Sequence, residues 1–219
     1  MNYNINDIMP YIKNYDFGEY FTAREEDFLV SSVDCDDDLE FDWDCGATKM
    51  VVIPENMDYV IKIPFNGYYD EFEKKYYEYC YSQNYCENEI ELYNEIFKEN
   101  PLFAQFFLPL TRVEEFREWD VYIQPKCQIY NNMDYFERSN SYSKASLIKI
   151  KSDDVLNCVG LPDDWLAAVA EVLDDIELVK KFINFLESHN ITEDLHRCNI
   201  GYYEDKPVIL DYAGYYDDF

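Results

Sequence analysis

The pattern of hydrophobic and polar residues in the first third of the chain predicts a short helix followed by strands. Isoleucine and methionine recur at helical spacing over residues 5–12, where Pro10 interrupts the pattern. The acid-rich stretch DCDDDLEFDWD then opens onto a strand. After Gly46, the β-branched runs TKMVVIP and DYVIKIPF are joined by ENM. They predict a β-hairpin whose second strand runs from about Tyr59 to Phe65.

The middle of the chain predicts one helix and two further strands. In ENEIELYNEIFKENP, apolar residues recur at helical spacing from Ile90 to Phe97, and the helix ends before Pro101. The runs LPLTRVEEF and WDVYIQPKC predict two strands separated by the turn REW. Strand character fades after Pro125.

The last third predicts helices and a closing hairpin. A short helix is expected around Met133 to Ser139. LPDDWLAAVAEVLDDIELVKKFINFLESHN is strongly helical, as one helix or as two broken near Asp174, and Asp163 and Asp164 are placed to cap its start. NIGYY and PVILDY predict two short strands around the turn EDK, and no internal repeat is found.

Composition and charge narrow the classes of partner. The 219 residues are 48% apolar and 18% aromatic, so the chain can bury a core. A formal net charge of −28 argues against duplex nucleic acid as a ligand, which is bound through Lys and Arg, and against an anionic membrane surface. This excess of acid serves solubility, or it imitates nucleic acid and occupies a basic protein surface.

The cysteines and the first residues point to a reduced, cytoplasmic setting. The seven cysteines form no C-x-x-C motif and leave one over if paired, and the chain begins without a basic-then-apolar leader. No apolar run approaches the length of about 20 residues that a membrane helix needs. With only two histidines, the spacing rules for a metal site of Cys and His are not met.

Two motifs near the end, preceded by a lysine in a strand and a glutamate in a helix, carry a family resemblance. DLHRCN and VILDYAG, following YVIKIP and NEIELY in this order, resemble the protein-kinase-like superfamily over about residues 40–219. The closing motif is most similar to the aminoglycoside and choline phosphotransferase branch. The resemblance implies a two-lobed α+β fold. Residues 1–126 would form an N-terminal lobe with an antiparallel sheet, and 127–219 a truncated, mainly helical C-terminal lobe.

The resemblance implies roles for the polar residues of the closing motifs. Phosphoryl transfer needs a divalent metal, a carboxylate that positions the acceptor, and a cation on the non-transferred phosphates. By resemblance, Asn199 and Asp211 would hold Mg²⁺, which prefers hard oxygen ligands. Asp194 would accept or orient the proton of the acceptor hydroxyl, and His196 would brace the loop.

The lysine role falls to Lys62 in YVIKIP. In the family this lysine pairs with a glutamate of the following helix and touches the α and β phosphates of ATP. Glu89 is the expected partner because an aliphatic residue follows it directly, and Glu87 and Glu91 remain alternatives.

The phosphate-covering loop departs from the family pattern. It offers a single glycine, Gly46, so the backbone amides of Ala47, Thr48 and Lys49 are expected to face a phosphate, with added charge from the Lys49 side chain.

The adenine of the nucleotide is expected against IQPKC. Gln124 would offer its carbonyl and Lys126 its amide, because Pro125 has no N–H.

The chain is therefore expected to be a phosphotransferase that uses ATP and Mg²⁺ on an unknown acceptor. Thr192 stands where the family carries His or Tyr, and only eight residues follow Asp211, so a platform for a protein substrate is missing. ATP binding is thus expected more firmly than protein phosphorylation. The alternatives are a pseudokinase or acidic inhibitor that occupies a basic partner, and a viral nucleic-acid mimic with an unrelated fold.

Overall fold

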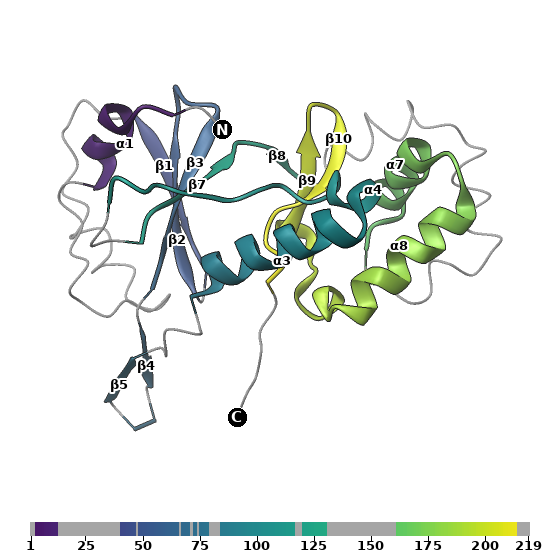
Figure 1. Cartoon of the computed structure of the whole chain (residues 1–219). Helices are drawn as coiled ribbons and strands as arrows, with labels where there is room; N and C mark the ends of the chain where they lie inside the picture. The colour runs from purple at the N-terminus through teal and green to yellow at the C-terminus, as the bar shows by residue number, and fades with distance from the viewer. Residues whose placement is uncertain are drawn as a thin grey trace. The chain divides into compact units, whose positions relative to one another are not determined.

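The protein is a mixed α+β chain that divides into two compact units (Figure 1). The computed structural model describes residues 3–12, 40–46, 48–65, 67–70, 72–73, 75–78, 84–116, 120–130 and 161–213. Unit 1 comprises Met1–Glu91 and Pro109–Lys126, and unit 2 comprises Leu92–Leu108 and Cys127–Phe219. The division falls within α3 (Tyr85–Glu99). Unit 2 thus includes 92–108, which the sequence assigned to the first lobe.

Unit 1 is built on a five-stranded antiparallel sheet with the strand order β1-β2-β3-β7-β6. A separate hairpin, β4–β5, extends from the same unit. The strands are β1 Phe41–Cys45, β2 Lys49–Pro54, β3 Tyr59–Pro64, β4 Gly67–Asp70, β5 Lys75–Glu78, β6 Thr111–Arg112 and β7 Tyr122–Pro125.

The two faces of the five-stranded sheet differ in what packs on them. Helix α1 (Ile5–Ile12) packs on one face, where Ile8 and Ile12 meet Ile61 and Ile63 in a buried cluster. On β3, Lys62 lies opposite Val51 of β2 and Tyr122 of β7, and paired residues of antiparallel strands point to the same face. Lys62 is therefore on the face opposite to α1.

Unit 2 is mainly helical and carries a small antiparallel sheet with the order β10-β9-β8. Its core is apolar and rich in aromatic residues, with Trp165 and Phe182 fully buried. The elements are α4 Pro101–Ala104, β8 Gln128–Ile129, α7 Asp163–Leu173, α8 Ile176–Ser188, the short 3₁₀ helices η3 Ile191–Asp194 and η4 Arg197–Asn199, β9 Ile200–Tyr203 and β10 Lys206–Ile209.

Several elements that the sequence predicted are confirmed. The helix over 5–12, the β2–β3 hairpin, α3, the pair β6 and β7, and the closing β9–β10 hairpin are all present. The long helical stretch is two helices, because Asp174 has a left-handed backbone (φ 51°) that ends α7. The closing turn is Glu204–Asp205, both with positive φ as two-residue hairpin turns require.

Other expectations about local structure are wrong. Pro162, not an aspartate, is the N-cap of α7 and makes no capping hydrogen bond, while Asp163 and Asp164 lie in the first turn, where negative charge complements the helix start. Asp164 is buried and accepts a hydrogen bond from the Tyr130 hydroxyl at 2.8 Å. Strand structure resumes after Pro125 as β8, and the β4–β5 hairpin was not anticipated. The expected helix around 133–139 lies outside the described residues.

Candidate functional site

A buried ion pair joins the central strand of unit 1 to α3. Lys62 Nζ lies 3.3 Å from Glu89 Oε2, and Lys49 Nζ, at the start of β2, lies 2.6 Å from Glu89 Oε1. All three side chains are at most 5% exposed. Because a buried charge is tolerated only when it is paired, these contacts fix the geometry of what we call the Lys–Glu–Lys cluster.

The structure selects one of the three glutamates that the sequence left open for Lys62. Glu89 is the partner, Glu91 is exposed, and Glu87 belongs to a different network. Glu87 Oε1 accepts hydrogen bonds from Arg112 Nη1 at 3.1 Å and from the Tyr122 hydroxyl at 2.7 Å. The helical register therefore separates Glu87 and Glu89 into two contacts with the sheet.

The network around Glu87 holds the first turn of α3 in place. Asn84 Oδ1 accepts the backbone N–H of Cys86 and of Glu87, and Asn84 Nδ2 donates to Asp120 and to the Tyr122 hydroxyl. Burial, followed by the hydrogen bond to Glu87, raises the pKa of Tyr122 well above its usual value of 10.0. Sequence reasoning missed this network because its members are far apart along the chain.

Val51, Ile53 and Val60 alternate along β2 and β3 with residues of the opposite face, and all three are half-buried. By register they share a face with Lys62, so the sheet presents partly exposed aliphatic surface beside a buried cation. An apolar surface with a few fixed polar groups is the usual lining of a small-molecule site.

Backbone groups of the loop expected to cover a phosphate form hydrogen bonds with neighbouring backbone. The Gly46 N–H donates to the Lys49 carbonyl at 3.0 Å, and the Thr48 carbonyl accepts from Phe65 N–H at 2.8 Å. A Cβ at position 46 would meet only the Lys49 carbonyl oxygen at 3.9 Å, so space does not require glycine there. Ala47 lies outside the described residues. The added charge of Lys49 is directed to Glu89.

The backbone amide expected to bind the adenine is hydrogen-bonded within the sheet. The backbone N–H of Lys126 donates to the Asp58 carbonyl at 2.7 Å, and the Lys126 Nζ donates to the Pro54 carbonyl at 2.9 Å. The backbone amide of Lys126 is therefore hydrogen-bonded to the turn between β2 and β3. Gln124 is buried in β7 opposite Val60.

In unit 2, Asn199 and Asp211 lie at the same end of the β9–β10 hairpin. Asn199 directly precedes β9, and its carbonyl accepts the N–H of Leu210 at 2.8 Å, immediately before Asp211. Asn199 is buried and Asp211 is half-buried. An amide oxygen and a carboxylate so placed have the donor chemistry that Mg²⁺ prefers.

The packing of this hairpin is specified by Gly201. A Cβ at this position would lie 2.4 Å from the Gln128 carbonyl oxygen, so only glycine allows β8 to approach β9. Trp165 Nε1 of α7 donates to the Gly201 carbonyl at 3.2 Å. These contacts fix the strand that follows Asn199.

The loop before Asn199 is braced locally. Asp194 ends η3, and His196 is the N-cap of η4, where its Nδ1 accepts the Cys198 N–H at 3.2 Å. The Asn199 N–H donates to the His196 carbonyl at 2.9 Å. His196 thus makes the kind of hydrogen bond that the sequence assigned to it.

No family model, curated protein or solved structure matches this chain. Within the described residues, no helix is both long and apolar enough to cross a membrane.

Proposed function

We propose that this chain is a kinase-like phosphotransferase that binds ATP and Mg²⁺ and transfers the γ-phosphate to an acceptor not yet known. The two units would correspond to the lobes of a two-lobed kinase-like fold. The observation that carries the proposal is the buried pair of Lys62 and Glu89, because a lysine on a central strand and a glutamate on the following helix meet as the motif order requires.

The Lys–Glu–Lys cluster supplies the positive charge that phosphates need. Glu89 holds the Lys62 ammonium group against the sheet, which limits the side-chain entropy that Lys62 would lose on contacting a phosphate. Lys49 shares the same carboxylate and adds a second cation. The half-buried Val51 and Val60 offer apolar surface for a base.

The β9–β10 hairpin of unit 2 fits a divalent metal by its donor chemistry. Asn199 and Asp211 would hold Mg²⁺, which would supply neutralising charge for the phosphates. Asp194 would orient the acceptor hydroxyl, and His196 keeps the loop between Asp194 and Asn199 in shape through its bond to Cys198.

Calorimetric titration with ATP, with and without Mg²⁺, tests the proposal. The wild-type chain should bind ATP, and Lys62→Met should weaken binding at least about tenfold, because a charge-assisted contact contributes about 1.5–3 kcal/mol. Asp211→Asn should remove the Mg²⁺ dependence while leaving metal-free binding. Lys180→Met and Asp205→Asn are matched controls at exposed pair and turn positions and should bind as the wild type does. Absence of binding at about 1 mM ATP would refute the proposal.

Loss of the γ-phosphate separates an active enzyme from a nucleotide-binding protein. Release of inorganic phosphate from ATP should fall by about 10²-fold or more in Asp194→Asn, with ATP affinity unchanged, because this carboxylate is assigned to the acceptor and not to the nucleotide. Equal release by wild type and variant would remove Asp194 from its proposed role.

A second candidate is a pseudokinase or acidic inhibitor that acts by occupying a basic partner. It is favoured by the net charge of −28 and by the Lys126 N–H, which is bound to Asp58. Capture of a basic protein from the native host should weaken as salt rises. Capture by Asp211→Asn equal to that by the wild type would show that the interaction does not depend on phosphoryl transfer.

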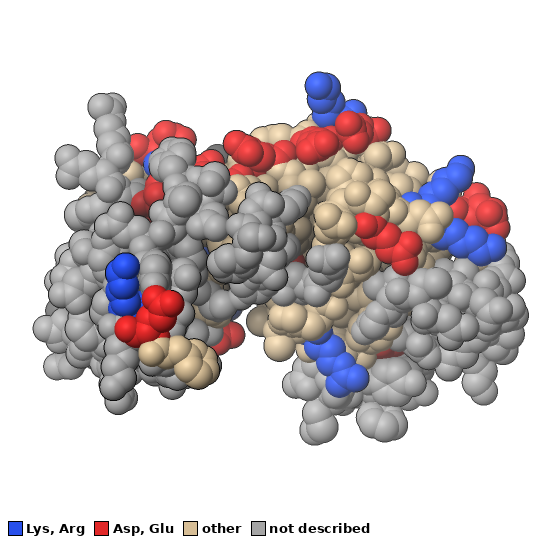
Figure 2. All heavy atoms as spheres, turned by 90° about the horizontal axis from the view of Figure 1, so that it is seen from below, with Lys and Arg blue, Asp and Glu red and all other residues tan. Residues whose placement is uncertain are grey.

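A nucleic-acid mimic, by contrast, requires carboxylates arrayed over one surface. On the face shown in Figure 2, the described Lys and Arg side chains lie among Asp and Glu. Among the described residues of α8, the exposed Lys180 Nζ also lies 2.9 Å from Glu177 Oε1. On this face, the described residues do not form the unbroken array of carboxylates that a mimic requires.

A further inference from the structure

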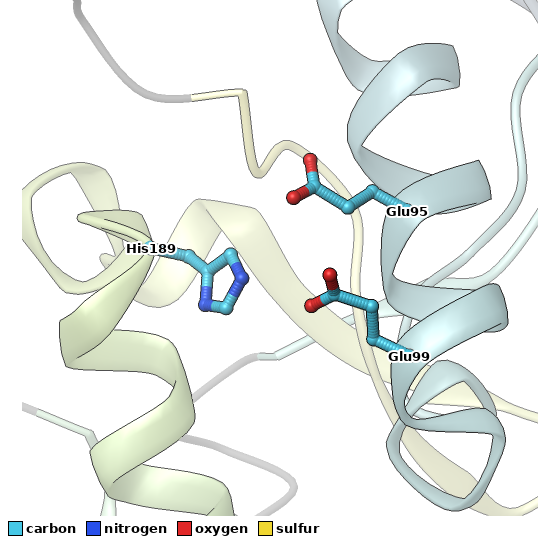
Figure 3. A group of neighbouring side chains, drawn as sticks. All are labelled: Glu95, Glu99 and His189. Carbon is cyan, nitrogen blue, oxygen red and sulfur yellow. The ribbon is translucent and has the colours of Figure 1, made fainter.

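A group of three potential metal ligands lies in unit 2, outside the residues assigned to nucleotide binding. Glu95 and Glu99 are on the last two turns of α3, and His189 is the C-cap of α8. One ligand atom from each side chain lies within 4.8 Å of the other two. Figure 3 shows the imidazole of His189 pointing toward both carboxylates.

The imidazole of His189 is held with one nitrogen available to a cation. Its Nδ1 lies 2.9 Å from the Phe185 carbonyl oxygen. Nδ1 also lies 3.1 Å from Ser188 Oγ. A hydrogen on Nδ1 satisfies the Phe185 carbonyl, which can only accept, and this tautomer presents the Nε2 lone pair to a cation. The ring also packs against Phe185 in a tilted arrangement, with centroids 4.2 Å apart. Such a hydrogen bond to the second nitrogen is typical of histidines that bind metals.

The spacing of the three side chains suits a cation between them better than direct ion pairing. Within the described part of the chain, His189 makes no ion pair with Glu95 or Glu99, whose carboxylates are exposed. Two donors of a tetrahedral site, each about 2.1 Å from the cation, are about 3.4 Å apart. Small rotations of the two exposed glutamate side chains bring the donors from their present spacing to this distance.

The electrostatics of the two helix ends also favour a cation at this place. Glu95 and Glu99 are like charges at i and i+4, and both lie near the C-terminus of α3, where negative side chains are unfavourable. The C-terminus of α8 is adjacent to His189 and adds further partial negative charge. A divalent cation would balance the two carboxylates and interact favourably with both helix ends.

We propose that Glu95, Glu99 and His189 bind one divalent transition-metal cation that links α3 to α8, with a coordination position left for water. Two carboxylates and one imidazole match Zn²⁺, which accepts nitrogen and oxygen ligands in four-coordinate sites, better than Mg²⁺, which prefers oxygen. The site is independent of the ATP-binding residues.

Imidazole NMR tests this site directly. The chain has two histidines, so a spectrum of the side-chain nitrogens of the full-length, chelator-treated protein contains two imidazole spin systems. Addition of one equivalent of ZnCl₂ should shift the Nε2 signal of His189 and leave His196 unchanged. A shift of His196 alone would place the zinc at the exposed Cys198 region and overturn the proposal.

Zinc affinity provides the second readout. Calorimetry should give a dissociation constant that rises about 10- to 100-fold in His189→Gln and in Glu99→Gln. Glu187→Gln, an exposed acid on α8, is the matched control and should bind zinc as the wild type does. Zinc should also raise the melting temperature of the wild type and of the control but not of His189→Gln. Equal zinc affinity in all four proteins would contradict the proposal and would mean that the three side chains are neighbours without a metal-binding role.

Discussion

Helix α3 makes its buried charged contacts in its first half, beside a small apolar cluster around Cys86, and its second half packs into the apolar core of unit 2. In unit 1, Glu87 and Glu89 join the helix to Arg112 and Lys62 of the sheet. In unit 2, Ile96 is fully buried in a cluster that contains the aromatic side chains of α7 and α8. One helix thus belongs to two environments whose energetics differ.

The apolar contacts of α3 contribute mainly to stability, and its charged contacts mainly fix the positions of side chains. Burial of apolar surface contributes about 25 cal/mol per Å² and has no direction, so the second half of α3 is anchored strongly. A buried ion pair gains little net free energy because both charges lose water, but its geometry is specific. The half of α3 that carries the candidate nucleotide-binding residues is therefore the half in which direction matters more.

Phe182→Ala should have the largest effect on stability, because it removes a large aromatic side chain from the apolar core of unit 2. The ring is fully buried and packs against Phe106 at 4.8 Å and Phe103 at 5.3 Å between centroids. Its removal should lower the free energy of unfolding by about 3–5 kcal/mol, measured by urea denaturation. Val172→Ala, at an exposed position of α7, should change it by less than about 0.5 kcal/mol. A loss below about 1.5 kcal/mol for Phe182→Ala would mean that this cluster does not anchor unit 2.

Glu89→Gln should come next, because it leaves two buried ammonium groups with an amide between them. The free energy of unfolding should fall by about 3 kcal/mol, since glutamine keeps one accepting oxygen but no charge. Glu91→Gln, two residues further along α3 at an exposed position, is the matched control and should be near neutral. Equal stability of the two variants would contradict the role given to the Lys–Glu–Lys cluster.

Replacement of the whole cluster sharpens the same point. The triple variant Lys49→Met, Lys62→Met and Glu89→Leu should have a free energy of unfolding within about 1 kcal/mol of the wild type, because the three charges of the cluster are removed together. The triple variant should nevertheless lose ATP binding. Stability and binding measured on one protein would then separate the structural role of the cluster from its proposed role toward phosphate.

The sequence predicted what depends on neighbours along the chain and missed what depends on tertiary contacts. Helical periodicity located α3 and α8, and β-branched runs located the β2–β3 hairpin. The two-residue strand β8 has no detectable pattern, and it exists because Gly201 allows close pairing. The family order located Lys62 and Glu89, but Lys49 on the same carboxylate could not be inferred from spacing.

Two features of the candidate sites that the sequence did not predict have the same physical origin. The backbone N–H of Lys126 is expected from the sequence to be available to a ligand, but it donates a hydrogen bond to the Asp58 carbonyl in the turn before β3. His189 matched no family position, and its proximity to Glu95 and Glu99 arises only because α3 and α8 belong to one core. A single sequence contains no signal for contacts between residues so far apart.

Tyr122→Phe should have a smaller effect that changes with pH. At pH 8 the variant loses the hydrogen bond to Glu87, and the free energy of unfolding should fall by about 1 kcal/mol. Burial raises the pKa of Tyr122 in the folded protein, so its stabilising contribution is complete below pH 10 and is lost as pH rises above the unfolded value of 10.0. The wild type should therefore lose up to about 1.4 kcal/mol per pH unit more than the variant above pH 10. Parallel pH profiles would contradict this account.

Lys180→Ala should have the smallest effect, because its ion pair is exposed. Lys180 Nζ lies 2.9 Å from Glu177 Oε1, a distance similar to those in the buried cluster, yet the side chains are 36% and 67% exposed. Water screens this pair, so a double-mutant cycle with Glu177→Ala should give a coupling of about 0.2–0.5 kcal/mol, and less at 1 M salt. The cycle of Lys62→Met and Glu89→Gln should give several times more. Equal couplings would show that burial is not what distinguishes the charged contacts of unit 1.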